Sequence, residues 1–259
     1  MTEPLVLYAV TDRIATITLN RPEKRNALNP ELVALLTEKL TMAAAAPEVK
    51  IIILKANGNT FSAGADLAYL QQLQHYTFEE NVADSNNLKN LFTTIYFCPK
   101  VIIAQVEGHA IAGGCGLATV CDFIFSVPEA QYGYTEVKLG FVPAIVSCFL
   151  MRKTSETIAK QILLTGDLFS AEKALAYGLI NFVTNKEDID LTTRNFALNL
   201  CNTTSANALK VTKQLIGRTT NPGLLESLDL AVKINAEVRE SEDFKKGITS
   251  FLNKQKLNW

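Results

Sequence analysis

The chain has 259 residues, of which 48% are hydrophobic and 20% are charged, so it is long enough for a large globular domain with a buried core. Its 25 Lys and Arg residues nearly balance its 26 Asp and Glu residues, which gives no electrostatic argument for binding nucleic acid or an anionic membrane. No apolar run approaches the roughly 20 residues that span a bilayer, and the polar N-terminal segment lacks a basic stretch, so we expect neither a membrane span nor a signal peptide.

The cysteines and histidines argue against a metal centre. The five cysteines, at positions 98, 115, 121, 148 and 201, form no CxxC pair, and His75 and His109 are the only histidines. Scattered spacing of this kind is typical neither of a disulfide framework nor of a zinc site. We therefore expect a cytoplasmic protein with reduced thiols and no metal.

Strand-like and helix-like segments alternate through the first half of the chain. Residues 5–10 and 14–19 predict a hairpin, and Asn29-Pro30 predicts the start of a helix that Pro47 ends. Buried strands are predicted at 51–54, 101–106 and 123–127, with helices at 78–97 and up to about 120 between them. This alternation predicts an α/β fold with parallel strands and right-handed crossovers.

Helices dominate from about residue 154 onward. They are predicted at 155–164, from Ser170, and at 190–201, 205–216 and 222–238. We divide the chain into a core, residues 1–195, and a C-terminal helical region, residues 196–259. The apolar surface of that region could cover the core or form a subunit interface.

Two stretches of small residues stand out, Phe61–Leu67 and Gly108–Gly116, and Glu136 lies twenty residues after the second. Each stretch follows a strand-like segment and opens a helix-like one, which leaves backbone N–H groups available to hold a developing negative charge. Tight packing in a turn would also explain the small residues, and Asp66 could simply cap a helix. Glu136 has apolar and aromatic neighbours in sequence, and desolvation there would raise its pKa into a range useful for general acid–base catalysis.

A dinucleotide-binding site fits this pattern poorly. The third glycine of the expected fingerprint is Thr119, and Glu136 follows a turn-like segment rather than a second strand. Walker A and Gly-x-Ser-x-Gly patterns are absent from the sequence.

Five segments together resemble the crotonase (enoyl-CoA hydratase/isomerase) superfamily, in the family's order and spacing. They are Asn20–Leu28, Phe61–Leu67, Gly108–Gly116, Cys121-Asp122 and Glu136–Pro143. The resemblance implies a crotonase-like spiral of ββα units with a C-terminal α-helical region. It also implies an acyl-CoA substrate, no cofactor apart from the coenzyme A of that substrate, and a homotrimer or a dimer of trimers.

The resemblance also assigns site residues. The backbone N–H groups of Ala65 and Gly113 would form an oxyanion hole for the thioester carbonyl. The residues that would line the coenzyme A channel are Arg25, Leu28, Ala63, Ala65, Asp66, Leu67, Gly113 and Gly114, joined by Phe251 and Lys254, which often reach coenzyme A from a neighbouring subunit.

The catalytic acids depart from the pattern of two-glutamate hydratases. Gly116 stands where the first glutamate of those enzymes lies, and Glu136 matches the second. Glu136 could then activate water and deliver the proton by itself. A single base would also suit an isomerase, a decarboxylase of the same family remains open, and so does a non-catalytic acyl-CoA-binding subunit.

His109-Ala110 before the glycines, Gly116 in place of a glutamate, and residues 135–147 are together most similar to bacterial methylglutaconyl-CoA hydratases of leucine degradation. Ala144–Ser147 replaces the glycine-rich stretch of general enoyl-CoA hydratases, so we expect a different acyl pocket. A methylglutaconyl group carries a distal carboxylate, and Lys138 and Arg152 are the nearest basic residues in sequence.

Overall fold

The computed structural model describes residues 3–220, 222–257 and 259. The polar N-terminal segment, for which we expect no signal peptide, therefore lies partly outside the described residues. A six-stranded sheet forms the centre of the molecule, with the strand order β1-β2-β3-β5-β7-β10. Its strands are β1 (Val6–Thr11), β2 (Ile14–Leu19), β3 (Ile51–Ala56), β5 (Val101–Val106), β7 (Phe123–Ser126) and β10 (Phe182–Val183). The hairpin β1–β2 is antiparallel and the other pairs of this six-stranded sheet are parallel, as the sequence predicts.

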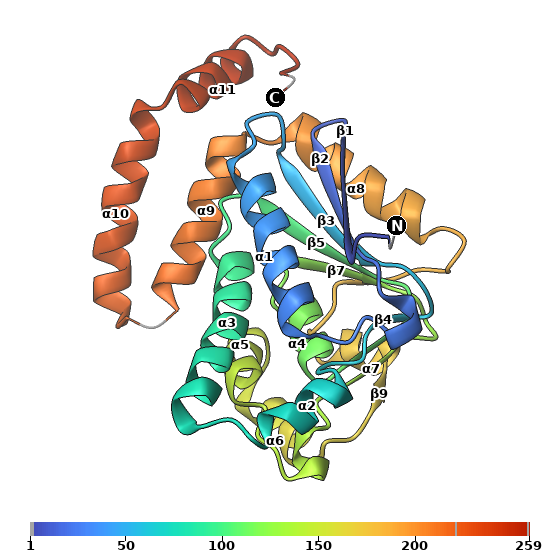
Figure 1. Ribbon diagram of the computed structural model, residues 1–259. Helices are drawn as coiled ribbons and strands as arrows, with labels where there is room; N and C mark the ends of the chain where they lie inside the picture. Colours follow the sequence, from blue (N-terminus) through green and yellow to red (C-terminus); the bar gives the residue numbers. More distant parts are fainter. Residues whose placement is uncertain (1–2, 221, 258) are drawn as a thin grey trace.

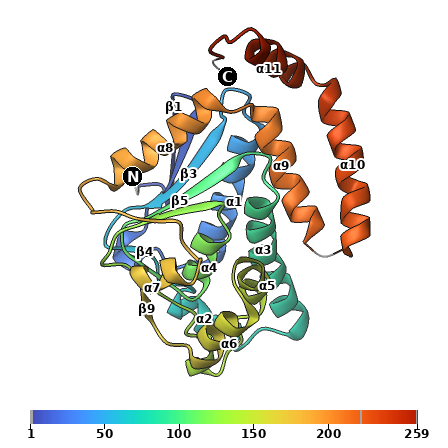
Figure 2. The same cartoon turned by 180° about the vertical axis from the view of Figure 1, so that it is seen from behind.

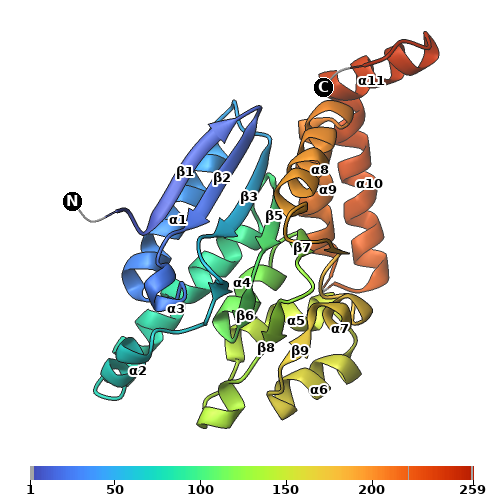
Figure 3. The same ribbon diagram turned by 90° about the vertical axis from the view of Figure 1, so that its right-hand side faces the viewer.

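A second, smaller sheet lies beside the end of the first (Figure 3). Its strands are β4 (Thr60–Ser62), β6 (His109–Ile111), β8 (Gln131–Gly133) and β9 (Phe169–Ser170). The chain passes from β3 to β4, from β5 to β6 and from β7 to β8, and a helix follows each pair. This repeated strand–strand–helix unit is the spiral that the resemblance implies.

Helices cover both faces of the large sheet (Figures 1 and 2). One layer holds α1 (Pro30–Ala45) and α3 (Phe78–Tyr96), and the opposite layer is formed by α8 (Ile189–Thr203) and α9 (Ala206–Thr219). Both faces of β3 and β5 are therefore buried, which explains their continuous apolar sequences. The boundary predicted at 195/196 falls inside α8, which packs on β3, β5 and β7.

The remaining helices are short or peripheral. They are η1 (Pro22–Lys24), α2 (Leu67–Leu73), α4 (Gly113–Thr119), η2 (Glu136–Leu139), α5 (Ala144–Lys153), α6 (Glu156–Thr165), α7 (Ala171–Ala176), α10 (Leu224–Glu240) and α11 (Glu242–Leu252). The sequence predicts a helix opening after Phe61–Leu67, which is α2, but none at α5 or α11. No helix among the described residues is long and apolar enough to cross a membrane.

Candidate active site

Ala65, Gly113 and Glu136 each follow a strand of the small sheet. Ala65 comes after β4, Gly113 after β6 and Glu136 after β8. These strands pair in parallel, so their carboxyl ends meet at one edge of the sheet. The structure therefore brings together the two predicted donors and the predicted acid.

The strands that present these residues differ from the expected ones. The sequence placed the two small-residue stretches directly after strands 51–54 and 101–106, whereas the stretches themselves contain further strand residues: β4 overlaps the start of the first stretch and β6 lies within the second. Strands of three residues are too short to show an alternating pattern, so their positions cannot be predicted from the sequence.

The N–H group of Ala65 is left available by the backbone bridge that holds its loop. The N–H of Leu28 donates to the Gly64 carbonyl at 2.7 Å, and the N–H of Asp66 donates to the Leu28 carbonyl at 2.9 Å. In a parallel bridge the residue between these two groups directs its own N–H away from the partner strand. No hydrogen bond found among the described residues uses the N–H of Ala65.

Gly113 begins α4, where N–H groups have no acceptor within the helix. The preceding Ala112 has φ +49° and ψ −126°, a backbone conformation that residues other than glycine rarely adopt. Ala112 is held there from both sides, since its N–H donates to the Gly133 carbonyl at 2.7 Å and its carbonyl accepts from the Gly116 N–H at 3.1 Å. The strained backbone thus fixes the direction of the Gly113 N–H relative to β8.

The two donor loops touch, and glycine makes this contact possible. Gly64 has φ +82°, and a Cβ atom there would lie 2.8 Å from the Cβ of Ala112 and 3.3 Å from the backbone nitrogen of Gly113. A Cβ atom on Gly114 would lie 2.3 Å from the carbonyl oxygen of Ser62. Close packing therefore requires these glycines and places the N–H of Gly113 beside the loop that carries Ala65.

Glu136 is half-buried at the start of η2. Its Oε2 atom is buried and has no hydrogen-bond partner among the described residues. Burial raises the pKa of this carboxyl above its ordinary value. A carboxyl group in this state can accept and return a proton closer to neutral pH than an exposed glutamate.

Tyr134 connects the segment that carries Glu136 to α4 through a hydrogen bond. Its hydroxyl lies 2.7 Å from the Thr119 hydroxyl, and both side chains are buried. Cys115 is also buried in this region, and burial raises the pKa of its thiol to about 12, so it offers no thiolate nucleophile.

The space beside Gly116 is filled by apolar side chains. A Cβ atom at this position would lie 2.3 Å from Cγ1 of Val146 and 3.0 Å from Cε1 of Phe92. Position 116 therefore supplies no carboxylate, and Glu136 is the carboxylate on this side of the site.

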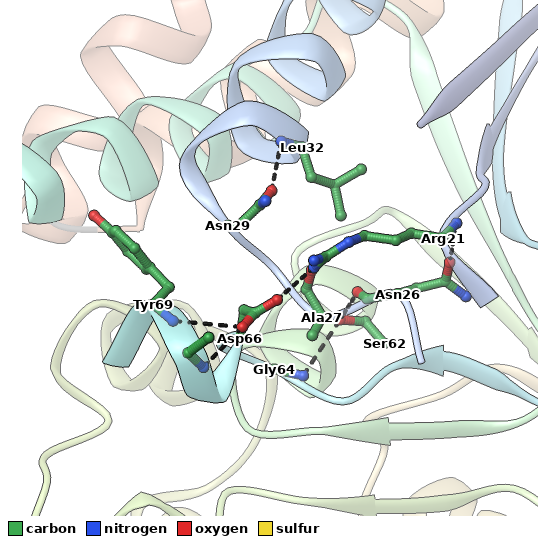
Figure 4. A network of polar contacts seen from close by, with 10 residues as sticks. Arg21, Asn26, Ala27, Asn29, Leu32, Ser62, Gly64, Asp66 and Tyr69 are labelled. Atoms are coloured by element: carbon green, nitrogen blue, oxygen red, sulfur yellow. Dashed lines mark hydrogen bonds and ion pairs between the residues drawn. The ribbon is translucent and has the colours of Figure 1, made fainter. Parts of the chain in front are cut away.

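A polar network fixes the loop of Ala65 to residues 20–28 (Figure 4). The side chain of Asn26 is fully buried, accepts from the Arg21 N–H at 2.8 Å, and donates to the carbonyls of Asn57 and Thr60 at 2.9 and 2.7 Å. The Ser62 hydroxyl donates to the Asn26 carbonyl at 2.9 Å. The sequence predicts no role for Arg21 or Asn26, because a single buried asparagine carries no periodic signal that would reveal it.

Asp66 belongs to the same network. Its carboxylate accepts from the Arg21 guanidinium at 2.6 Å and from the Ala68 N–H at 2.9 Å at the start of α2. The Arg21 hydrogen bond, together with the backbone N–H donors, holds the pKa of this carboxyl below its ordinary value. The helix-capping interpretation is confirmed, and any contact of Asp66 with coenzyme A would come in addition to it.

Most of the predicted coenzyme A residues cluster around these loops. The Arg25 carbonyl accepts from the Ala63 N–H at 3.0 Å, and the Leu28 side chain reaches toward Gly113. Leu67 is 75% exposed at the start of α2.

Phe251 and Lys254 lie elsewhere. They are at the end of α11, at the opposite end of the molecule from α2 and β4 (Figure 1). A single chain therefore does not bring them to the site.

The candidate groups for a distal carboxylate have partners already. The Lys138 ammonium lies 2.7 Å from Asp167, and the Arg152 guanidinium donates to the Cys148 carbonyl at 2.6 Å. His109 supports the small sheet, where its Nδ1 accepts from the Gln131 N–H at 3.2 Å. No group of three or more potential metal ligands gathers in the part of the chain that the structure describes.

Comparisons with known proteins show which family the chain resembles. The family model described as Enoyl-CoA hydratase/isomerase matches residues 10–259. A Thermus thermophilus protein, named only provisionally as an enoyl-CoA hydratase, is 41% identical over 246 residues, which cover 93% of this chain and 95% of the relative. The crotonyl-CoA hydratase of Syntrophomonas wolfei is 31% identical over 260 residues, covering 98% and 97%. The crystal structure of a Mycobacterium smegmatis enoyl-CoA hydratase superposes with a TM-score of 0.93 at 26% identity, covering 99% of both chains.

Proposed function

The chain belongs to the enoyl-CoA hydratase/isomerase family, and from this premise we propose that it adds water across the double bond of a 2-enoyl-CoA. The observation that carries the proposal is the meeting of two available N–H donors and one half-buried carboxyl at a single edge of the small sheet. Such a set can polarise a thioester carbonyl and move a proton.

The N–H groups of Ala65 and Gly113 would hold the thioester oxygen while it gains negative charge. Both donors are set by the surrounding backbone before substrate binds, so they need no reorganisation during the reaction. Loss of one donor of this kind typically raises the barrier by about 3–4 kcal/mol.

Glu136 would perform both proton transfers. Its carboxylate takes a proton from the water whose oxygen bonds to C3, and the double-bond electrons move to the thioester oxygen as an enolate. The protonated Glu136 then returns a proton to C2, which forms the 3-hydroxyacyl-CoA and restores the carboxylate. The raised pKa and the unpartnered Oε2 atom support this role.

For the acyl group we propose 3-methylglutaconyl-CoA, an intermediate of leucine degradation. The sequence of residues 135–147 supports this choice. The surroundings of Gly116 are apolar, so a distal carboxylate would lie on the η2 side, where Lys138 stands.

Isomerisation of an enoyl-CoA is the second candidate, and the glycine at position 116 favours it. A single carboxylate can shuttle one proton between two carbons of the substrate without taking up water. A decarboxylase of the same family and a non-catalytic acyl-CoA-binding subunit are the further alternatives.

The test is an assay of the purified protein with 3-methylglutaconyl-CoA and crotonyl-CoA, in which products are weighed by mass spectrometry. Gain of one water supports hydration, whereas an unchanged mass with a shifted double bond supports isomerisation. The Glu136→Gln variant should lose about 10²–10⁴-fold in kcat. Glu129→Gln, which changes an exposed glutamate in the turn before β8, should retain wild-type activity and serves as the control.

The other expectations remain proposals. We propose a homotrimer or a dimer of trimers in the cytoplasm, in which Phe251 and Lys254 of one copy reach the coenzyme A of another. The exposed apolar residues of α11, which are Phe244, Ile248, Phe251 and Leu252, support the assembly, and the five unpaired cysteines support the location. Coenzyme A would enter as part of the substrate, and the mechanism above needs no other cofactor.

A further inference from the structure

A cavity of about 300 Å³ lies where α1 ends and where β3, β5 and α9 begin. The end of α1 and the start of α9 lie at the opposite end of the molecule from α2 and β4 (Figure 1). Residues 44–46, the alanines that end α1, line the cavity, and their short side chains leave the space open. The cavity is therefore separate from the candidate active site.

Three lysines line this cavity, and no acidic residue does. Lys50 and Lys100 directly precede Ile51 and Val101, which pair in the parallel ladder of β3 and β5, so the two lysines come from neighbouring strands. Lys210 is exposed in the first half of α9. None of the ion pairs found among the described residues involves these lysines, so three positive charges meet here without a paired carboxylate.

Two of the lysines are held by the carboxyl ends of helices. The Lys50 ammonium donates to the Cys201 carbonyl at 2.8 Å and to the Thr204 carbonyl at the end of α8, and the Lys100 ammonium donates to the Ala46 carbonyl at the end of α1. An ammonium group has three donors, so one remains on Lys50 and two remain on Lys100. Burial lowers the pKa of both groups, because their charges lose hydration. The carbonyl partners are neutral and leave these charges uncompensated.

The start of α9 adds backbone donors to the same cavity. Ser205 caps the helix, and its hydroxyl accepts from the Ala208 N–H at 2.9 Å. The N–H groups of Ala206 and Asn207, two residues that line the cavity, have no acceptor in the part of the chain that the structure describes. Bare N–H groups and the positive end of the helix dipole both favour a bound anion.

Two acidic residues lie near the cavity but do not line it. Asp243 accepts a hydrogen bond from the Ser205 hydroxyl, and Glu48 is exposed before β3. Their charges act at longer range on the lysines that precede β3 and β5, and Arg13 acts there with the opposite sign. The cationic groups thus outnumber the acidic ones around the cavity.

We propose that this cavity binds a phosphate group, supplied either by inorganic phosphate or by a small phosphate monoester. The three ammonium groups would compensate its charge, and the two N–H groups would orient its oxygens. Val49, Val101 and Leu209 give the cavity an apolar wall against which the carbon atoms of a monoester would pack. The bound group would connect the end of α1 to α9, from which α10 and α11 continue.

Titration calorimetry with sodium phosphate and with glycerol 3-phosphate tests the proposal, with the ionic strength kept constant by sodium chloride. The wild type should bind at least one of the two at one site per chain, and the tighter ligand identifies the source of the phosphate group. At about five times Kd, the ligand should raise the unfolding temperature by about 2–4 °C. No saturable binding of either ligand would overturn the proposal.

Lys210 is the residue to change first, because no hydrogen bond or ion pair of its side chain is found among the described residues. Lys210→Gln should lower phosphate affinity by about tenfold, the effect of losing one charge-assisted hydrogen bond, and Lys210→Arg should retain most of the affinity. Lys233→Gln, the same change at an exposed lysine of α10, is the control and should bind as the wild type does. Equal losses in Lys210→Gln and Lys233→Gln would overturn the proposal.

A second variant blocks the cavity without weakening the helix. Ala206 is exposed at the first position of α9, where a glutamate favours the helix. Ala206→Glu should therefore fold and lower phosphate affinity by at least about tenfold, because its carboxylate repels the ligand and occupies the same donors. Unchanged affinity in this variant would overturn the proposal.

The same variants distinguish this cavity from the proposed coenzyme A channel. Phosphate that binds only in that channel would keep its affinity in Lys210→Gln and in Ala206→Glu, and this result would also overturn the proposal. If the cavity is the site, both variants should leave KM for crotonyl-CoA unchanged. Failure of the hydration assay would not affect the binding result, since the cavity does not depend on the reaction.

Discussion

The half-buried carboxyl of Glu136, at the edge of the small sheet, affects both the stability of the folded state and the proposed proton transfer. The Oε2 atom of Glu136 has no hydrogen-bond partner among the described residues, and burial raises the pKa of this group. A buried carboxylate destabilises the folded state, because its charge loses hydration without gaining a partner. The same burial gives it the proton affinity that general acid–base catalysis requires.

Glu136→Gln should therefore make the protein more stable at neutral pH. A carboxyl whose folded pKa is raised contributes stability below its unfolded pKa and loses it as the pH rises through the folded pKa. The difference in unfolding free energy between Glu136→Gln and the wild type should be positive at pH 7 and disappear below about pH 4, the range of an ordinary glutamate. Urea unfolding across this pH range measures it, and an equal difference at both ends would contradict the burial of the charge.

Ala112 is a second residue at which a cost in stability accompanies a role in the proposed site. Its φ of +49° costs conformational energy and directs the Gly113 N–H. Ala112→Gly should raise the unfolding free energy by about 1 kcal/mol through relief of strain. The looser donor should lower kcat by about tenfold, a fraction of the effect of losing a donor entirely. Thermal unfolding and steady-state kinetics measure the two effects, and an unchanged kcat would show that the strain does not position the donor.

At the level of elements, the site is built where short segments from distant parts of the chain cross. Residues 20–28 and β4 approach each other around the buried side chain of Asn26, and α4 packs against the same loop through Gly64 and Gly114. The longer elements were predictable because apolar periodicity accumulates over many residues, as in α1 and α3. The strands β4, β6 and β8 were missed because three residues give no period, and their pairing is decided by non-local hydrogen bonds.

The Asn26→Ala substitution should weaken the contact between residues 20–28 and β4. The substitution leaves the carbonyls of Asn57 and Thr60 without their donor, which should lower the unfolding free energy by about 3 kcal/mol. We also expect KM for the acyl-CoA to rise more than kcat falls, because the loop would line the proposed coenzyme A channel. The exposed Asn57, changed to Ala, is the control for loss of an asparagine in the same region. Equal effects of the two substitutions would show that the buried network is not what holds the loop.

At the level of the whole molecule, the C-terminal helices leave a large apolar surface uncovered. On α10, Leu225 is 77% and Val232 70% exposed, and on α11 the residues Phe244, Ile248, Phe251 and Leu252 form a stripe at helical spacing. Exposed apolar area of this extent is typical of a surface that another protein chain covers. It supports the proposed assembly of several copies.

Charges placed on this surface should prevent assembly. Leu225→Glu combined with Val232→Glu would bury two unpaired carboxylates in the subunit interface, so we expect monomers where the wild type forms trimers or larger assemblies. Lys233→Glu alters an exposed charge on the same helix and should not change the assembly. Size-exclusion chromatography with light scattering distinguishes these masses. A wild type that is itself monomeric would contradict the proposed oligomer.

The sequence by itself determined the α/β alternation and the family, and it predicted the two donor loops and Glu136 as the acid. These features are local, since small residues, periodicity and a glutamate in an apolar segment can each be read along the chain. Only the tertiary structure decided how the space beside Gly116 is filled, how Asn26 and Arg21 hold the donor loop, and that Glu136 has an unpartnered oxygen. Each of these depends on contacts between residues far apart in sequence, and neither spacing nor composition records which side chain occupies which space.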